Sequence, residues 1–288
     1  MRSNLTGWAF VAPATLLVIG LAIFPAVWAF LLSLQKTDLI TPAKNVGLGN
    51  YADMLKDPYA AHAVWHTLFF TAVFVPASII IGLLLAIALN QRIRLTGFYR
   101  TAIFVPFVAS AAATGILANF VFDPRFGVAN NLLRVVGVPP QGFLESRTQA
   151  MLVLVVIALW GSIGFNVVIY LAALQDIPRD VVEAAWMDGA GKRQVFWHVT
   201  VPSLMPVTVF VTVWQVITGL QLFDLVYTTT RGGPLDTTVT IVYYIYDVAF
   251  HRTHFGYGSA VAYGLFTVTM FITLFMVWYS RHTKVEAF

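Results

Sequence analysis

Six long stretches of the chain contain no Asp, Glu, Lys or Arg, and this pattern predicts six helices that cross a membrane. The charge-free stretches are residues 3–35, 58–91, 101–122, 148–175, 194–223 and 253–280. A spanning helix needs about 20 consecutive, mostly apolar residues, so each stretch is long enough for one crossing. Their apolar cores predict helices at 9–34, 63–90, 101–121, 150–174, 204–226 and 258–280. Segment 237–246 is apolar but too short to cross, and we expect an amphipathic interfacial element or a strand there.

The composition narrows the class of protein further. Hydrophobic residues make up 59% of the 288 residues and charged residues 10%, whereas soluble domains have about 25% charged residues. This balance argues against a soluble enzyme and against a disordered chain. The absence of cysteine excludes disulfides, thiolate metal sites and cysteine nucleophiles. We therefore expect an all-α membrane protein with a single transmembrane domain over residues 1–288.

Basic residues in the short loops predict the orientation, because Lys and Arg favour the cytoplasmic side. The loop at 91–100 and the C-terminus carry such residues, namely Arg92, Arg94, Arg100, Arg281 and Lys284. Both termini are therefore expected in the cytoplasm, although Arg125, Arg134 and Arg147 then fall outside. The outward loops are expected at 35–62, 122–149 and 227–257. The net charge of +4 is better explained by loops beside a bilayer than by nucleic-acid binding.

The loop at 175–203 is the longest inner loop and the most charged one. Pro178 can open a helix and Asp180 can cap it. A short helix is expected at about 181–188, ended by Gly189, with a second short helix at 192–199. A bare connector needs only a few residues, and the small residues of this loop permit close approach by another protein.

The residues of this loop resemble the EAA motif of ATP-binding-cassette (ABC) importer permeases. The matching residues are Glu183-Ala184-Ala185, Asp188-Gly189-Ala190, Phe196, Val199, Pro202 and Pro206. Phe223–Tyr227 with Gly232-Gly233-Pro234 resembles the segment after the fifth helix of carbohydrate-type permeases, and Val46–Tyr51 resembles their first outer loop. The likeness covers essentially the whole chain. It is with the sugar and glycerol-phosphate permeases related to the maltose permease F subunit and the glycerol-3-phosphate permease A subunit.

This resemblance implies the type I importer permease fold, with six transmembrane helices, in a bacterial or archaeal inner membrane. The chain would form one half of a pore, as a heterodimer with a second permease subunit. Two cytoplasmic ABC ATPase subunits would drive it, and an extracytoplasmic solute-binding protein would deliver a carbohydrate or related polyol. The helix around 181–190 would be the coupling helix. Its ATPase-coupling residues would be Glu183, Ala184, Ala185, Asp188, Gly189 and Ala190.

The chain itself is expected to be neither an enzyme nor the holder of a cofactor. Gly191-Lys192-Arg193 resembles the end of a phosphate-binding P-loop. That motif needs Gly where Trp186 stands and Ser or Thr where Arg193 stands. ATP and magnesium would therefore bind to the partner ATPase subunits. No metal site is expected either, because neither histidine pair has a clear third ligand; the pairs are His62 with His66 and His251 with His254.

Polar side chains inside spans are costly and often line a path for solute. Gln215 would lie about 16 Å from the inner end of the fifth helix, near the midplane, on a stripe with Thr208, Thr212 and Gly219. The residues expected along a substrate path are Asn166, Tyr170, Thr212, Gln215, Thr218, Gln221, Asp224, Tyr263 and Thr267. Interhelical hydrogen bonding by the same side chains is an equally good interpretation of each residue.

Three other classes of protein compete with this interpretation. A secondary transporter driven by an ion gradient would usually carry buried charges along its path, and Asp224 is the only acid inside a proposed span. A membrane-embedded enzyme would need clustered catalytic side chains, which the sequence does not show. An importer of another solute, such as glycerol phosphate, another anion or an amino acid, differs only in the solute that it carries.

Overall fold

The computed structural model describes residues 2–91 and 94–282, and most of these are helical. Arg92 and Lys284, which the orientation argument uses, lie outside the described residues, as does the side chain of Arg281. The chain packs as two compact units, which are described separately below. The first consists of Met1–Ala61 with Tyr244–Val268, and the second of His62–Tyr243 with Thr269–Phe288.

The first unit begins with a long apolar helix. It consists of α1 (Arg2–Val18), the π-helical turn η1 (Ile19–Ile23) and α2 (Phe24–Ser33). The part from Phe10 to Ser33 is long and apolar enough to cross a membrane. In its most apolar stretch of 18 residues, no residue is buried. Such exposure of apolar side chains suits a helix surrounded by lipid or by another chain.

Hydrogen bonds between polar groups stabilise the rest of this unit. Strands β1 (Gln35–Lys36) and β2 (Lys44–Asn45) pair antiparallel, and α3 (Gly49–Lys56) follows. The Asn50 Nδ2 atom donates hydrogen bonds to the carbonyl oxygens of Ser33 at 2.8 Å and Gln35 at 2.9 Å. The later elements are α14 (Ile241–Tyr246), which starts in the second unit, η4 (Asp247–His251), and α15 (Phe255–His282), which ends in the second unit.

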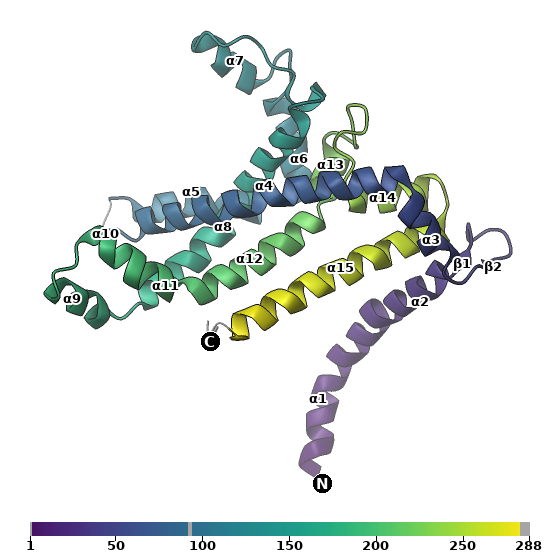
Figure 1. Ribbon diagram of the computed structural model, residues 1–288, viewed down its shortest axis with the longest axis horizontal. Coiled ribbons are helices and arrows are strands. Elements are labelled where there is room, and N and C mark those ends of the chain that lie inside the picture. Colours follow the sequence, from purple (N-terminus) through teal and green to yellow (C-terminus); the bar gives the residue numbers. More distant parts are fainter. Residues whose placement is uncertain (1, 92–93, 283–288) are drawn as a thin grey trace. The chain divides into compact units, whose positions relative to one another are not determined.

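The second unit holds most of the buried side chains. Its elements are α4 (Pro58–Leu89), α5 (Thr96–Val108), α6 (Ala111–Val121), α7 (Val128–Val135), η2 (Phe143–Glu145), α8 (Ala150–Asp176), α9 (Arg179–Met187), α10 (Lys192–Val195), η3 (Phe196–Thr200), α11 (Val201–Ser203), α12 (Met205–Leu220) and α13 (Asp224–Thr228). Helix α5 runs alongside α8, and α6 turns away from both (Figure 1). Gly164 permits this packing, because a Cβ there would lie 2.7 Å from the carbonyl oxygen of Ile103.

Four described helices are long and apolar enough to cross a membrane, and six spans result if each of two bent helix pairs is one span. The prediction of a third helix at 101–121 misses a bend of 102° between α5 and α6, where Ala109 and Ser110 have extended backbones. The fifth predicted helix, 204–226, ends earlier, at Leu220, and it follows a bend of 61° after Ser203.

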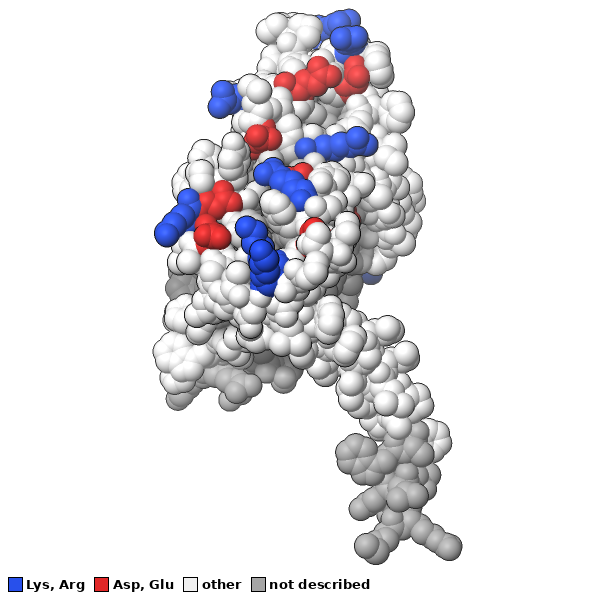
Figure 2. Space-filling view, turned by 90° about the vertical axis from the view of Figure 1, so that its right-hand side faces the viewer, with Lys and Arg blue, Asp and Glu red and all other residues white. Residues whose placement is uncertain are grey.

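Three local predictions also need correction. Of the two alternatives for segment 237–246, an amphipathic interfacial element or a strand, the strand is wrong, because Ile241–Tyr246 form the helix α14. Pro178 is the N-cap residue of α9, so Asp180 lies in the first turn and does not cap the helix. The expected second short helix at 192–199 is α10 followed by the π-helical turn η3. Figure 2 shows basic and acidic side chains singly or in small groups among uncharged ones.

Candidate functional site

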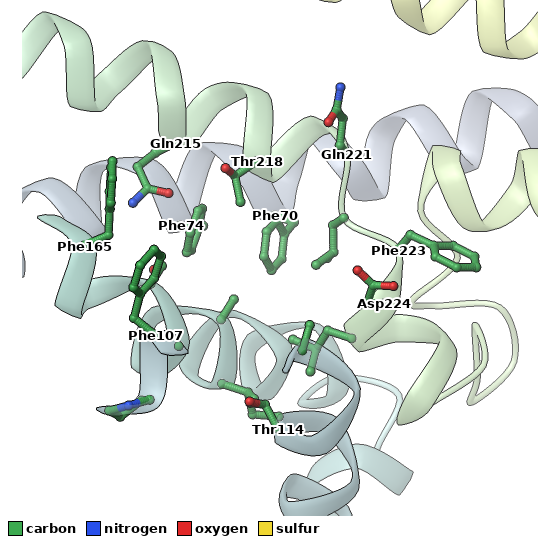
Figure 3. Close-up of a pocket in the computed structure, with 18 of the residues that line it drawn as sticks. Phe70, Phe74, Phe107, Thr114, Phe165, Gln215, Thr218, Gln221, Phe223 and Asp224 are labelled. Atoms are coloured by element: carbon green, nitrogen blue, oxygen red, sulfur yellow. The ribbon is translucent and has the colours of Figure 1, made fainter. Parts of the chain in front are cut away.

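The second unit contains a cavity of about 340 Å³ between α4, the α5–α6 bend, α8, α12 and α13. Its walls are mostly aromatic. The aromatic lining residues are Phe70, Phe74, Phe107, Phe165, Trp214 and Phe223. The Phe165 ring stacks on Trp214 at a centroid distance of 5.2 Å and lies 5.5 Å from that of Phe107. Figure 3 shows polar side chains of α12 and α13 along the same space.

Gln215 is the buried polar group of this cavity. Its side chain extends from α12 toward the space between Phe165 and Phe74 (Figure 3), and the residue is 1% exposed. Its Nε2 atom donates to Asn166 Oδ1 of α8 at 2.6 Å, and Asn166 Nδ2 donates to the carbonyl oxygen of Ser78 of α4 at 3.0 Å. The Gln215 Oε1 atom has no hydrogen-bond partner among the described residues. A buried acceptor without a partner in the protein is rare, and this one is available to a donor in the cavity.

The structure brings four of the predicted path residues to this cavity and leaves the others elsewhere. Gln215, Thr218, Gln221 and Asp224 line it. Thr218 Oγ1 also donates to the carbonyl oxygen of Trp214 at 2.9 Å. Asp224 lies in the first turn of α13, beyond the end of α12, and not inside the fifth span as predicted.

Asn166, Tyr170 and Thr212 do not line the cavity, and each makes a bond between or within helices. The buried Tyr170 hydroxyl donates to Thr208 Oγ1 at 3.3 Å, and Thr212 Oγ1 donates to the Thr208 carbonyl oxygen at 2.6 Å. Tyr263 and Thr267 belong to α15 in the first unit. There the Tyr263 hydroxyl donates to the Ala26 carbonyl oxygen, and Thr267 Oγ1 donates to the Tyr263 carbonyl oxygen.

The aromatic walls are functional candidates that the sequence analysis did not find. Phe70 and Phe74 are four residues apart on α4, and their rings stack at 5.3 Å. Phe165 precedes Asn166, and Trp214 precedes Gln215. The only available signal was this adjacency of an aromatic to a polar residue, because aromatic residues within an apolar stretch otherwise look the same whether they face lipid or a cavity.

The second candidate region is the segment that links α8 to α12. Helix α9 ends at Gly189 with a φ of +82°, as predicted. The Ala190 amide donates to the Ala185 carbonyl oxygen and the Gly189 amide to that of Trp186, both at 3.0 Å. This pair of bonds is the Schellman motif, which glycine favours because an L side chain is strained at positive φ.

An open hollow of about 320 Å³ lies between α9 and the turns that follow it. Its lining residues are Ala185, Asp188, Gly189, Ala190, Gln194, Val195, His198 and Val199. Glu183 and Ala184 are exposed on α9. The Gly191 amide donates to Gln194 Oε1 at 2.8 Å, which closes the turn into α10. The predicted coupling residues therefore form an exposed helix with a small-residue border.

A carboxylate held by two tyrosines lies in the first unit. Asp57 Oδ2 accepts hydrogen bonds from the hydroxyls of Tyr244 and Tyr257, the latter at 2.6 Å. Burial opposes ionisation of Asp57, but these bonds and backbone amides outweigh it and hold the pKa of Asp57 below its usual value. Burial, together with the Asp57 carboxylate, raises the pKa of Tyr244 to about 12. This contact ties the start of α4 to α14 and α15.

One histidine of each pair, His66 and His251, makes an ordinary hydrogen bond. His66 Nδ1 lies 3.1 Å from the Val239 carbonyl oxygen, and His251 Nδ1 lies 3.1 Å from Asp247 Oδ1. Over residues 2–91 and 94–282, no three His, Asp or Glu side chains gather in a way that could hold a metal ion.

Comparisons with known proteins agree on one kind of protein. Residues 78–285 match the family model described as a binding-protein-dependent transport system inner membrane component. The lactose transport system permease protein of Rhizobium radiobacter is 36% identical over 98% of this chain and 96% of its own length. The sn-glycerol-3-phosphate transport system permease protein of Agrobacterium fabrum is 32% identical over 93% of this chain and 92% of its own.

A solved structure shares the fold. It is a bacterial alginate ABC transporter in complex with an alginate pentasaccharide-bound periplasmic protein. One of its chains superposes with a TM-score of 0.87 at 20% identity, covering 98% of this chain and 96% of that chain. At this identity the likeness establishes the fold, which is the importer permease fold that the sequence predicted.

Proposed function

The chain belongs to the family of inner membrane components of binding-protein-dependent transport systems, and on this premise we propose that it is one permease subunit of an ATP-driven importer for a carbohydrate or a related polyol. The named relatives are permeases for lactose and for glycerol 3-phosphate. The proposal concerns the solute, the path that it takes and the way in which ATP hydrolysis is coupled to its movement.

The observation that carries the proposed solute path is the unpartnered Oε1 atom of Gln215 beside the cavity. Leaving a buried acceptor unpaired costs about 1–3 kcal/mol. A solute hydroxyl that donates to this atom in the place of water avoids the cost, and hydroxyl groups are what carbohydrates and polyols carry in number. The Nε2 atom is already held by Asn166, so the amide presents its oxygen in a fixed orientation.

The remaining walls suit the same class of solute. A cavity of about 340 Å³ lies within the usual range of small-molecule sites, about 300–1,000 Å³. Such sites combine mainly apolar and aromatic walls with a few placed polar groups. Here Phe70, Phe74 and Phe165 supply surface for the C–H faces of a ring, while Thr218 adds a hydroxyl group. Gln221 also lines the cavity, but its amide points away from Phe70 (Figure 3).

Coupling is proposed to run through α9. The exposed helix with Glu183, Ala184 and Ala185, ended at Gly189, docks into a partner ATPase subunit, and the hollow beside it receives part of that partner. When the ATPases close on ATP, α9 moves, and the bent segment into α12 carries the movement to the helix that bears Gln215. The spans then rock between inward-facing and outward-facing states.

The proposal includes the partners and the orientation. A second permease subunit completes the pore, two cytoplasmic ABC ATPase subunits bind ATP and magnesium, and an extracytoplasmic solute-binding protein delivers the solute. The related alginate transporter was solved with its periplasmic protein, which supports the last of these. Both termini lie in the cytoplasm, and this chain carries no catalytic site and holds no cofactor.

Replacing Gln215 with Leu tests the path. The complete transporter in proteoliposomes should show at least a tenfold higher KM for uptake of its solute, because the buried acceptor is gone. Gln175→Leu is the matched control, since Gln175 is exposed at the far end of α8. If Gln215 served only to bond α12 to α8, Gln215→Leu would lower the melting temperature and leave KM unchanged, and the proposed path would be wrong.

A further inference from the structure

We propose that this chain's side of the cavity selects uncharged hydroxylated solutes against anionic ones, and that Asp224 is the residue that sets this preference. The inference rests on the proposed solute path and goes beyond it. Family membership does not decide the question, because the similar permeases are named for an uncharged sugar and for a phosphate ester. The charge on the cavity walls is therefore what distinguishes the two kinds of solute.

Asp224 is the single charged side chain among the described residues that line the cavity. None of the other lining residues is Lys, Arg or His. Figure 3 shows the Asp224 carboxylate at the cavity, on the side opposite Phe165. In the described part of the chain, the two ion pairs that form both involve Asp247, so no basic side chain neutralises Asp224 there.

An anionic solute would find no counter-charge on these walls. Phosphate and carboxylate groups are usually held by Arg or Lys, which repay the loss of hydration with charge-assisted hydrogen bonds. Here the same groups would exchange water for aromatic rings, whose faces are negative, and would approach a carboxylate. Asp224 is exposed in this chain, but the aromatic walls beside it are of low dielectric and make the repulsion stronger than it would be in bulk water.

The N-terminus of α6 favours anions at the cavity, but this effect is weaker than the repulsion by Asp224. Helix α6 starts at Ala111, which lines the cavity, and a helix N-terminus carries about half a positive charge. A full carboxylate charge outweighs it. The amides of that first turn can still donate to a neutral hydroxyl oxygen, just as Gln215 Oε1 can accept from a hydroxyl hydrogen. A solute group that both donates and accepts without net charge therefore fits these walls.

Paired probes that differ in one anionic group test this inference. Binding is measured for methyl β-D-glucopyranoside against methyl β-D-glucopyranosiduronate, and for the corresponding galactose pair, in which only the C6 group changes from CH2OH to carboxylate. The method is calorimetry on the complete transporter in nanodiscs without the binding protein. The wild type should bind each neutral sugar at least tenfold more tightly than its acid. Asp224→Asn, which keeps the shape of the side chain, should reduce this ratio about tenfold, mainly by strengthening the binding of the acid.

Asp236→Asn is the matched control, because it removes one exposed carboxylate that does not line the cavity, and it should leave the ratio unchanged. A ratio near one in the wild type, or a ratio that Asp224→Asn does not change, would overturn the charge selection. If that result came with binding that Gln215→Leu abolishes, the solute path itself would stand. If neither neutral sugar nor acid bound the wild type, the proposed path would fail, and the selection with it.

Discussion

Replacement of Gly189 by Asp should uncouple the permease from its ATPase without unfolding it. Gly189 ends α9 at a φ of +82°, and its amide and that of Ala190 close the helix on Trp186 and Ala185. Nothing lies within 4 Å of the place where a Cβ would be built. Within this chain, therefore, the new side chain meets open space and only the backbone is strained.

The size of that strain can be bounded. A left-handed conformation costs an L residue roughly 1–2 kcal/mol, and Asp tolerates it better than most residues. The expected cost is thus about 1 kcal/mol, well below the roughly 5–15 kcal/mol that keeps a domain folded. A loss of coupling by a factor of 100 would need about 2.7 kcal/mol. The part of this loss that backbone strain does not explain has to come from the bulk and charge of the Asp side chain against a docked partner.

The chain supplies a matched control in Gly137. This glycine follows α7 with a φ of +76°, nothing lies within 4 Å of its Cβ position, and the amides of Gly137 and Val138 donate to Arg134 and Leu133 in the same Schellman pattern. Gly137→Asp therefore imposes the same backbone cost in a loop expected outside. Gly189→Asn adds a third variant, which keeps the bulk of Asp and removes its charge.

The assay is co-purification of the complete complex followed by solute-stimulated ATP hydrolysis in proteoliposomes. Gly189→Asp should lose the ATPase or its stimulation, Gly137→Asp should keep both, and both chains should insert and pair with the second permease. Normal association and transport in Gly189→Asp would refute the docking assignment. Equal losses in the two Asp variants would show that backbone strain is responsible, and would refute the assignment as well.

Three further predictions concern topology, catalysis and pH. In this naturally cysteine-free chain, a cysteine at position 236 should be labelled by an impermeant maleimide from outside and a cysteine at 192 should not, and the reverse pattern would overturn the orientation. The purified chain alone should not hydrolyse ATP; hydrolysis that Lys192→Ala abolishes would contradict this. The folded pKa of Asp57 is lowered. The ionised Asp57 should therefore stabilise the fold fully above the unfolded pKa of about 3.9, and this stabilisation should be lost as the pH drops through the folded pKa. In Asp57→Asn, the melting temperature should accordingly depend less on pH below about pH 4. Tyr244 acts at high pH, because its pKa is raised to about 12. Its contribution to stability is complete below about pH 10 and is lost toward pH 12, so in Tyr244→Phe the melting temperature should depend less on pH in this range.

The elements that the sequence predicted well are those governed by local rules. Long charge-free stretches predict long helices wherever a membrane removes water from the backbone, and α4 and α8 follow their stretches closely. The end of α9 was predictable because Gly189 is the residue that a left-handed C-cap requires. The bend between α5 and α6 was not, because no glycine marks it. Pro106 lies inside α5, three residues before the extended backbones of Ala109 and Ser110. The contacts that hold α6 in its new direction are made further along, where Gly115 and Asn119 meet Thr228, and such tertiary contacts are not visible in the local sequence.

In the candidate site, too, local sequence predicted some features and missed those that depend on packing. Gln215 was predictable from its polarity and depth, and so was the alternative that Asn166 and Tyr170 bond between helices. Depth alone cannot separate a residue that lines the cavity from one that holds two helices together, because both are polar and buried. The aromatic walls were invisible for a related reason. Phe74 faces the cavity while Phe120 is 62% exposed on α6, and only packing between distant segments distinguishes them.

The two breaks in the helices give independent support to a polar path. Non-helical backbone at membrane depth is tolerated only where it is buried in protein or lines a water-filled cavity, since lipid offers no hydrogen bonds. The bend at Ala109 and the break at 221–223, between α12 and α13, both lie among the residues that line the cavity around Gln215. The bend within the third span and the end of the fifth span thus meet at one place. The amides of Ala109, Gln221 and Leu222 donate within the chain, to the carbonyl oxygens of Pro106, Ile217 and Gly219. Water or a hydroxylated solute in the cavity can bond the other peptide groups at these breaks, which lipid tails could not. The placement of the breaks therefore favours a hydrated cavity at the centre of this unit, in agreement with the unpartnered Gln215 oxygen.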